Sequence, residues 1–227
     1  NTSSAASDVY KRQDVDGRFP NHHPNPVDPD TLKLLNEQVH SAGAECGIGF
    51  DGDGDRIGVI DKTGRQVSGD LLTAFLSLDI LDRHKGAEIL FDVKSSSTAL
   101  DIVRQAGGKP HLWRTGHSHM KKRLKELGAP LAGEMSGHIF IADDFYGFDD
   151  ALYVACRFLS RLTHMKQERN ESLADFLDQL PPSFTTPECH IHCPDNEKFT
   201  AVERLSQQIG AVMPAEQMNL IDGVRLT

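Results

Sequence analysis

Apolar residues recur every three or four positions in the stretch that follows Asp28. Leu32, Leu35 and Val39 keep this helical spacing until Gly43, where the pattern stops. Asp28 can cap the first turn, because its carboxylate can accept a hydrogen bond from a free backbone N–H group. The pattern therefore predicts a helix that begins just after Asp28 and ends at Gly43.

Strands and helices alternate along most of the remaining chain. Short apolar runs bounded by turn residues predict strands at 46–50, 57–60, 66–67, 88–93, 110–113, 187–193 and 218–222. Longer amphipathic stretches predict helices at 69–84, 97–106, 118–127, 149–163, 171–180 and 196–209. This alternation is typical of βαβ units, and we expect an α/β fold of layered α/β/α domains with mixed, largely parallel sheets.

Composition narrows the class of protein. The 227 residues suffice for one large domain or two small ones with a substantial core. The 33 acidic and 24 basic residues give a net charge of −9, which opposes binding to nucleic acid. No apolar run approaches the roughly 20 residues of a membrane helix, and the four cysteines form no CxxC pair. We therefore expect a cytoplasmic protein without a nucleic-acid or membrane partner.

The first part of the chain is unlike a folded domain. Residues 1–13 contain few apolar side chains and resemble translated adapter sequence, so we interpret them as a non-native leader. Residues 14–29 are rich in Pro, Asn, His and Gly, which is typical of an irregular surface loop.

The strongest chemical signal is the sequence AspGlyAspGlyAspArg. Asp51, Asp53 and Asp55 alternate with glycines that let the backbone wrap, so their oxygens can converge on one hard cation such as Mg²⁺. An Asx-rich turn without metal is the alternative. A calcium-binding EF-hand fits poorly, because Arg56 stands where that loop needs Gly and Lys62 where it needs Glu.

The segment GlyGluMetSerGlyHis at 133–138 is predicted to be a loop. Glu134, Ser136 and His138 occupy alternate positions, so in an extended conformation they project to one side. Such groups can hydrogen-bond sugar hydroxyls or a phosphate. A polar turn between a strand and a helix remains the alternative.

Two further positions lie where a strand ends and a helix begins. Thr115, Gly116 and His117 precede the predicted helix 118–127, where free N–H groups and the helix dipole favour an anion. Lys94 follows a strand end, at the edge where open α/β sheets bind ligands. In the alternative interpretation these residues are solvated surface groups.

Three other clusters favour structural interpretations. Cys189 and Cys193 would face away from His190 and His192 on a strand, which argues against a zinc site. The basic run 121–125 is interpreted as a solvated helix face. The histidines at 22–23 lie among prolines that fix the loop conformation.

Taken in order, the motifs resemble those of the α-D-phosphohexomutase family, and within it the phosphomannomutase/phosphoglucomutase group. The resemblance rests on 15–26 (ValAspGlyArgPheProAsnHisHisProAsnPro), 50–56 (PheAspGlyAspGlyAspArg), 91–94 (PheAspValLys), 115–118 (ThrGlyHisSer), 133–138 and 220–225 (LeuIleAspGlyValArg).

The resemblance implies a division of the chain. The family has four domains around a cleft, and on this template 14–65 is the C-terminal part of domain 2, 66–180 is domain 3 and 181–227 is a truncated start of domain 4. No serine here matches the loop that is phosphorylated in domain 1 of the family, nor is the later phosphate loop of domain 4 present. We therefore expect residues 1–227 alone to be inactive, and the full-length form to be a monomer.

The resemblance also implies a site and a reaction. Asp51, Asp53 and Asp55 would bind Mg²⁺. The expected catalytic residues are Arg56, His117 and His138. The expected substrate-binding residues are Lys94, Thr115, Gly116, His117, Glu134, Met135, Ser136, Gly137 and His138. The implied reaction moves phosphate between C1 and C6 of mannose or glucose phosphates through a phosphoserine and a bisphosphorylated sugar.

Two alternatives stay open at this point. One is phosphoglucosamine mutase, although Met135 stands where those enzymes usually carry Gln. The other is a module that binds phosphosugar or metal without turnover.

Overall fold

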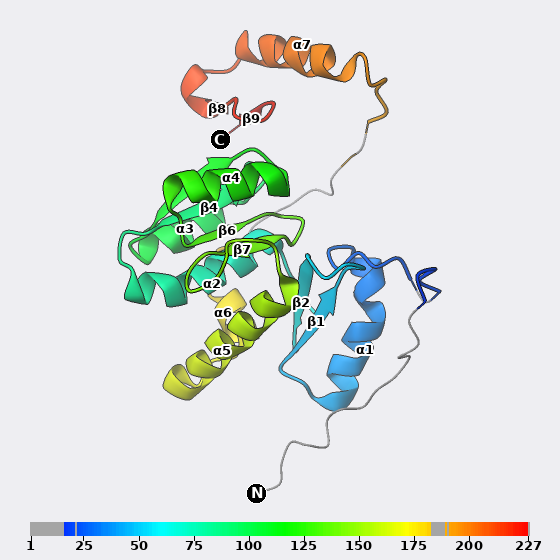
Figure 1. The fold of residues 1–227 in the computed structure, drawn as a ribbon, viewed down its shortest axis with the longest axis vertical. Helices are drawn as coiled ribbons and strands as arrows, with labels where there is room; N and C mark the ends of the chain where they lie inside the picture. The colour runs from blue at the N-terminus through cyan, green and yellow to red at the C-terminus, as the bar shows by residue number, and fades with distance from the viewer. Residues whose placement is uncertain (1–15, 21, 183–188, 190, 227) are drawn as a thin grey trace, which may run out of the picture.

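The computed structural model describes residues 16–20, 22–182, 189 and 191–226. The expected leader at 1–13 lies outside the described residues. Figure 1 shows the described chain as an N-terminal part, a central α/β part and a C-terminal segment that follows residue 190.

The N-terminal part is a small antiparallel sheet covered by a helix. Its elements are η1 (Pro29–Leu32), α1 (Lys33–Ala42), β1 (Cys46–Phe50), β2 (Ile57–Asp61) and β3 (Gln66–Val67). Asp28 caps η1 by accepting from the Asp30 N–H group, and Gly43 ends α1 with a left-handed φ of 59°. The strand order is β1-β2-β3. Because Phe50 pairs with Ile57, residues 51–56 form the loop of the β1–β2 hairpin.

The central part is a four-stranded sheet with helices on both faces. Its elements are α2 (Gly69–Arg83), β4 (Glu88–Asp92), α3 (Ser97–Gln105), β5 (Lys109–Trp113), α4 (His117–Leu127), β6 (Leu131–Gly133), β7 (Ile139–Ile141), α5 (Ala151–Arg169) and α6 (Leu173–Asp178). The order is β5-β4-β6-β7. β4 runs parallel to β5 and β6, whereas β7 runs antiparallel to β6.

Alternate residues of β4 pack against helices on opposite faces of the sheet. Ile89 and Phe91 belong to the large core formed with α2, α3, α5 and α6. Leu90 packs instead with Met120 and Leu124 of α4 on the opposite face. Since successive strand residues point to opposite faces, the sheet lies between α4 and the other helices, and the expected α/β class with mixed sheets is confirmed.

The C-terminal segment contains α7 (Lys198–Gly210), η2 (Ala215–Gln217), β8 (Met218–Asn219) and β9 (Arg225–Leu226). It touches the central part where β4 and β5 end. Arg225 donates to the carbonyls of Val93 and Ser95, both at 2.6 Å, and Arg114 Nε donates to the Ile221 carbonyl at 2.9 Å.

Three expectations from the sequence were incomplete or wrong. β6 and β7 were not predicted, although the loop 133–138 between them was. The strand expected at 187–193 is absent over 191–193, while 187, 188 and 190 lie outside the described residues. The strand expected at 218–222 ends at Asn219, because the chain turns through Gly223, with a φ of 72°, and returns as β9. Among the described helices, none is long and apolar enough to cross a membrane.

Candidate active site

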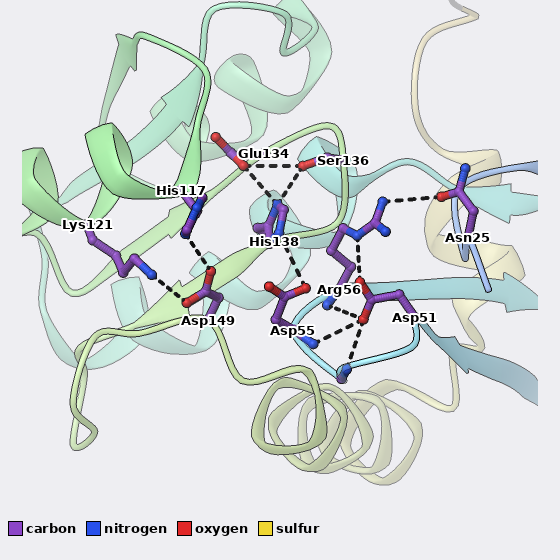
Figure 2. Close-up of polar contacts among 11 residues, drawn as sticks. Asn25, Asp51, Asp55, Arg56, His117, Lys121, Glu134, Ser136, His138 and Asp149 are labelled. Atoms are coloured by element: carbon purple, nitrogen blue, oxygen red, sulfur yellow. Dashed lines mark hydrogen bonds and ion pairs between the residues drawn. The ribbon is translucent and has the colours of Figure 1, made fainter. Parts of the chain in front are cut away.

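Asp51 shapes the loop 51–56, which we call the metal loop (Figure 2). Its Oδ1 accepts hydrogen bonds from the backbone N–H groups of Gly54, Asp55 and Arg56 at 3.0, 3.1 and 3.1 Å. Its Oδ2 accepts from Arg56 Nε at 2.7 Å. One carboxylate therefore folds the loop back on itself and holds the arginine beside it.

These bonds keep Asp51 ionised. Burial raises its pKa, but the side-chain and backbone hydrogen bonds from Arg56 outweigh that effect and lower the pKa to about 2. Arg56 also reaches Asn25, whose Oδ1 lies 3.4 Å from the guanidinium. The loop that precedes η1 thus supports the metal loop from the side.

The three carboxylates of the metal loop converge, as the sequence predicted. Asp51, Asp53 and Asp55 each offer an oxygen within 4.8 Å of the others. Within the described residues, Asp55 Oδ1 is buried without a hydrogen-bond partner. Burial raises the pKa of Asp55, and the neighbouring Asp51 and Asp53 raise it further, although His138 acts in the opposite direction. Carboxylate oxygens gathered in this way suit a hard divalent cation.

The loop 133–138, which we call the sugar loop, lies directly against the metal loop. Gly137 has a φ of 92°, and a Cβ added there would lie 2.6 Å from the Ile57 carbonyl oxygen. Its own carbonyl accepts from the Ile57 N–H group at 3.1 Å, and Arg56 and His138 form a β-bridge. Glycine at 137 therefore permits the close approach of the two loops.

Glu134, Ser136 and His138 gather on one side of the sugar loop, as their alternation predicted. Glu134 Oε2 lies 3.0 Å from His138 Nδ1 and accepts from Ser136 Oγ at 3.2 Å. Its Oε1 accepts from the Gly116 N–H group at 2.5 Å. On the other side of the imidazole, His138 Nε2 lies 3.4 Å from Asp55 Oδ1. Contacts thus connect the metal loop to His138 and Glu134 (Figure 2), and the Gly116 N–H group links Glu134 to the start of α4.

The Glu134–His138 pair shifts both groups toward their charged forms. Burial raises the pKa of Glu134, but bonds from His138, the Gly116 N–H group and Ser136 outweigh it and lower the pKa. Burial lowers the pKa of His138, but Glu134 and the charges of Asp55 and Asp149 raise it above its usual value. A protonated His138 is therefore favoured in this arrangement.

The start of α4 completes this side of the site. His117 stacks on His138, with ring centroids 5.8 Å apart and planes 21° from parallel. The Thr115 N–H group donates to Asp222 Oδ2 of the C-terminal segment at 3.0 Å. Gly116 has a φ of 120°, a conformation that favours glycine.

Lys94 and Met135 lie apart from these groups. They line an open cavity of about 1400 Å³ together with Asp222 and Arg225 of the C-terminal segment. The Met135 N–H group donates to the buried Asp92 carboxylate at 3.3 Å. Two of the expected substrate-binding residues therefore line this cavity, whereas His117, Glu134 and Ser136 contact His138.

Sequence reasoning missed Asp149, and it interpreted Lys121 as part of a solvated face. Lys121 Nζ lies 2.9 Å from Asp149 Oδ1, and His117 Nδ1 lies 3.5 Å from Asp149 Oδ2. His117 and Lys121 are one helical turn apart and share a face of α4, which was the available signal. Nothing in the local pattern showed that Asp149 would meet that face.

Comparison with known proteins places this geometry in a family. Residues 68–184 match the family described as phosphoglucomutase/phosphomannomutase, alpha/beta/alpha domain III, and residues 5–64 match domain II of the same description. The expected division at 65/66 and 180/181 stays a prediction beside these ranges.

Curated relatives match nearly the whole chain. The chain is 44% identical over 213 residues to a phosphomannomutase/phosphoglucomutase of Pseudomonas putida, covering 94% of this chain and 45% of the relative. It is 38% identical over 214 residues to a phosphoglucomutase of Neisseria gonorrhoeae, with the same coverage of 94% and 45%. The chain thus spans less than half the length of these relatives.

A solved structure shares the fold. The crystal structure of a phosphoglucomutase/phosphomannomutase family protein from Burkholderia thailandensis has a TM-score of 0.83 and 38% identity, covering 94% of this chain and 44% of that one. With both domain descriptions matched and the metal and sugar loops in contact, this chain belongs to the phosphoglucomutase/phosphomannomutase family of α-D-phosphohexomutases.

Proposed function

We propose that the gene product carrying this chain is a Mg²⁺-dependent phosphomannomutase/phosphoglucomutase. It moves phosphate reversibly between C1 and C6 of mannose or glucose phosphates, through a phosphoserine and a bisphosphorylated sugar. The observation that carries the proposal is the contact between the two loops. His138 lies 3.4 Å from Asp55 of the metal loop and 3.0 Å from Glu134 of the sugar loop.

Asp51, Asp53 and Asp55 are the proposed Mg²⁺ ligands. The donor set fits this ion, since it consists of carboxylate oxygens and includes a buried Asp55 oxygen without a hydrogen-bond partner among the described residues. Arg56 and three N–H groups hold Asp51 in place, which orients the ligand as outer hydrogen bonds do in metal sites. A bound Mg²⁺ would stabilise the charge that develops during phosphoryl transfer.

The sugar phosphate is proposed to bind between the start of α4 and the sugar loop. Thr115, Gly116 and His117 lie at the N-terminal end of α4. A bound phosphate would replace Asp222 and Glu134 as the acceptors of the Thr115 and Gly116 N–H groups. Ser136 and Glu134 hydrogen-bond sugar hydroxyls, and because the Glu134 side chain is only 2% exposed, its bond to a hydroxyl replaces one of its present contacts. Lys94 is proposed to meet the substrate from the cavity side.

Phosphoryl transfer requires a group that takes and returns the hydroxyl proton. We assign this role to His138, whose Nδ1 is held by Glu134 and whose Nε2 is directed toward the metal loop. Arg56 steadies the loop and the transferring phosphate. Transfer of this kind depends mainly on positioning and on neutralising charge.

We also propose a cytoplasmic location. Cys46, Cys156 and Cys193 are free thiols in the part of the chain that the structure describes, as expected for a reducing compartment.

A coupled assay tests the proposal. The gene product is mixed with glucose 1-phosphate, Mg²⁺ and catalytic bisphosphate. Added glucose-6-phosphate dehydrogenase and NADP⁺ oxidise the glucose 6-phosphate formed and give NADPH. We expect turnover that requires Mg²⁺ and falls at least about 100-fold in Asp53→Asn, because that carboxylate is a proposed ligand. Absence of turnover with both glucose and mannose 1-phosphate would overturn the proposal.

Phosphorus NMR separates the alternatives, because it also detects the mannose 6-phosphate and glucosamine 6-phosphate that the coupled assay does not report. Faster conversion of glucosamine 1-phosphate than of either hexose phosphate would indicate phosphoglucosamine mutase. Tight binding of sugar phosphate with no conversion of any of the three would indicate a binding module.

A further inference from the structure

Asp149 is held in place by three parts of the molecule. It forms a β-bridge with Phe140 of β7, and the next residue, Asp150, is the N-cap of α5. The Ala151 N–H group donates to the Gly54 carbonyl of the metal loop at 3.0 Å. These backbone contacts on both sides fix the position of the Asp149 backbone beside the site.

The Asp149 carboxylate faces α4. Its side chain is 9% exposed, and Oδ1 accepts from Lys121 Nζ at 2.9 Å. Oδ2 is buried and has no hydrogen-bond partner among the described residues, although His117 Nδ1 lies 3.5 Å away. Asp55 and His138 also face this carboxylate, each with one polar atom within 4.8 Å.

A buried carboxylate oxygen without a donor is energetically unfavourable. The His117 ring can supply that donor, because its side chain is 53% exposed and needs to move only a few tenths of an ångström. Hydrogen bonds at such sites are often long before the ligand binds and shorten when it does. Lys121 already compensates the charge of Asp149, which argues against a second metal ion at this place.

We propose that Asp149 is a positioning residue for His117. It accepts a hydrogen bond from His117 Nδ1–H and thereby leaves Nε2 as the atom presented to the phosphosugar. The relation of Glu134 to His138 Nδ1 is the same, so the two stacked imidazoles are each held through Nδ1 by a buried carboxylate. A carboxylate in this role selects one tautomer and one ring orientation, as in serine-protease triads. The link to substrate rests on the proposed function, whereas the tautomer does not.

The tautomer can be measured on the 227-residue chain without any substrate. Long-range ¹H–¹⁵N correlation spectra of the histidine rings, recorded where His117 is neutral, report which nitrogen carries the proton; a His117→Gln spectrum assigns the signal. We expect Nδ1–H in the unmodified chain. An Nε2–H tautomer there would overturn the proposal, and this measurement needs no folded Asp149 variant.

Asp149→Asn provides the second test. The amide can donate to His117 Nδ1, so we expect the ring to change to the Nε2–H tautomer, with backbone spectra otherwise unchanged. Asp144→Asn is the matched control, because Asp144 lies in the same connection with its side chain 87% exposed and contacts Arg83 instead. An unchanged His117 tautomer in folded Asp149→Asn would contradict the proposal.

Activity provides a separate readout in the gene product. We expect Asp149→Asn to lower kcat/KM for glucose 1-phosphate by about 100-fold, as a small misplacement of a reacting group does, while Asp144→Asn retains the unmodified value. Equal kcat/KM in Asp149→Asn and the unmodified protein would overturn the positioning role. If the unmodified protein lacks mutase activity, the proposed function fails, and the tautomer alone decides the inference.

Discussion

Asp51 and Asp53 belong to the same short loop but have different surroundings. The Asp51 side chain is 3% exposed and accepts bonds from three N–H groups and Arg56, whereas Asp53 is exposed. Asp51→Ala leaves these donors without an acceptor, so we expect the free energy of unfolding to fall by about 2–4 kcal/mol. Asp53→Ala should change it by less than about 0.5 kcal/mol.

Urea unfolding followed by circular dichroism, in buffer without divalent cations, measures both changes. Equal losses of stability in the two variants would show that Asp51 does not organise the loop. Metal binding should weaken in both, since both carboxylates are proposed ligands.

Asp92 makes the stability of the folded chain depend on pH. Burial raises its pKa from the usual 3.8 to about 6, although bonds from Ser95 and the Met135 N–H group act in the opposite direction. Because the pKa is raised in the folded state, its stabilising contribution is complete below pH 3.8 and is lost as pH rises through about 6. Asp92→Asn removes this ionisation.

We therefore expect the stability of the unmodified chain, relative to Asp92→Asn, to fall by about 2 kcal/mol between about pH 4.5 and pH 7. Urea unfolding of both proteins across this pH range measures the difference. A pH-independent difference would mean that Asp92 titrates normally.

Some site residues could be inferred from local sequence and others could not. The alternation of carboxylates in 51–55 and of polar groups in 134–138 predicted which side chains gather, because both patterns act within one loop. Asp149 was missed because its contacts with His117 and Lys121 arise from tertiary structure. The hydrogen bond from the Gly116 N–H group to Glu134 could not be predicted for the same reason.

Two glycines in the loops of the site share a positive φ but differ in how closely neighbouring atoms pack against them. Gly54 and Gly137 have φ values of 77° and 92°, but a Cβ at Gly54 meets nothing within 4 Å, whereas one at Gly137 would lie 2.6 Å from the Ile57 carbonyl oxygen. Gly54→Ala should therefore lower the free energy of unfolding by only about 1 kcal/mol. Gly137→Ala should lower the free energy of unfolding by about 1–3 kcal/mol more, since the two loops must separate to make room for the Cβ.

Thermal unfolding of the two variants side by side gives this comparison. The Ile57 amide should also exchange with solvent faster in Gly137→Ala, because its bond to the Gly137 carbonyl is lost. If both variants lose the same stability, the contact between the loops is not tight.

The elements themselves differed in how readily sequence predicted them. α2, α3 and α5 contribute apolar residues to the large core, and apolar residues that recur over several helical turns are a reliable signal. β6 and β7 were missed because each has only three residues, too few to show a period, and no clear turn motif marks them as the turn at 62–64 marks β3. The apolar run at 187–193 predicted a strand, but 191–193 pairs with no strand among the described residues.

At the scale of the whole molecule, three parts of the chain meet around one region. The metal loop comes from the N-terminal part, and the sugar loop and the start of α4 come from the central sheet (Figure 1). The C-terminal segment adds Asp222, which accepts from the Thr115 N–H group at 3.0 Å. The strand ends of an open α/β sheet are where ligands bind, so this arrangement favours a site shared between parts.

Under the proposed function, this site takes part in the transfer of phosphate between two carbons of one sugar. Phosphorus NMR of the gene product with glucose 1-phosphate, Mg²⁺ and catalytic glucose 1,6-bisphosphate follows that transfer directly. We expect the glucose 6-phosphate signal to replace the glucose 1-phosphate signal until equilibrium, and Asp53→Asn to prevent this change. Release of inorganic phosphate instead, or an unchanged spectrum with folded protein, would contradict the proposed function.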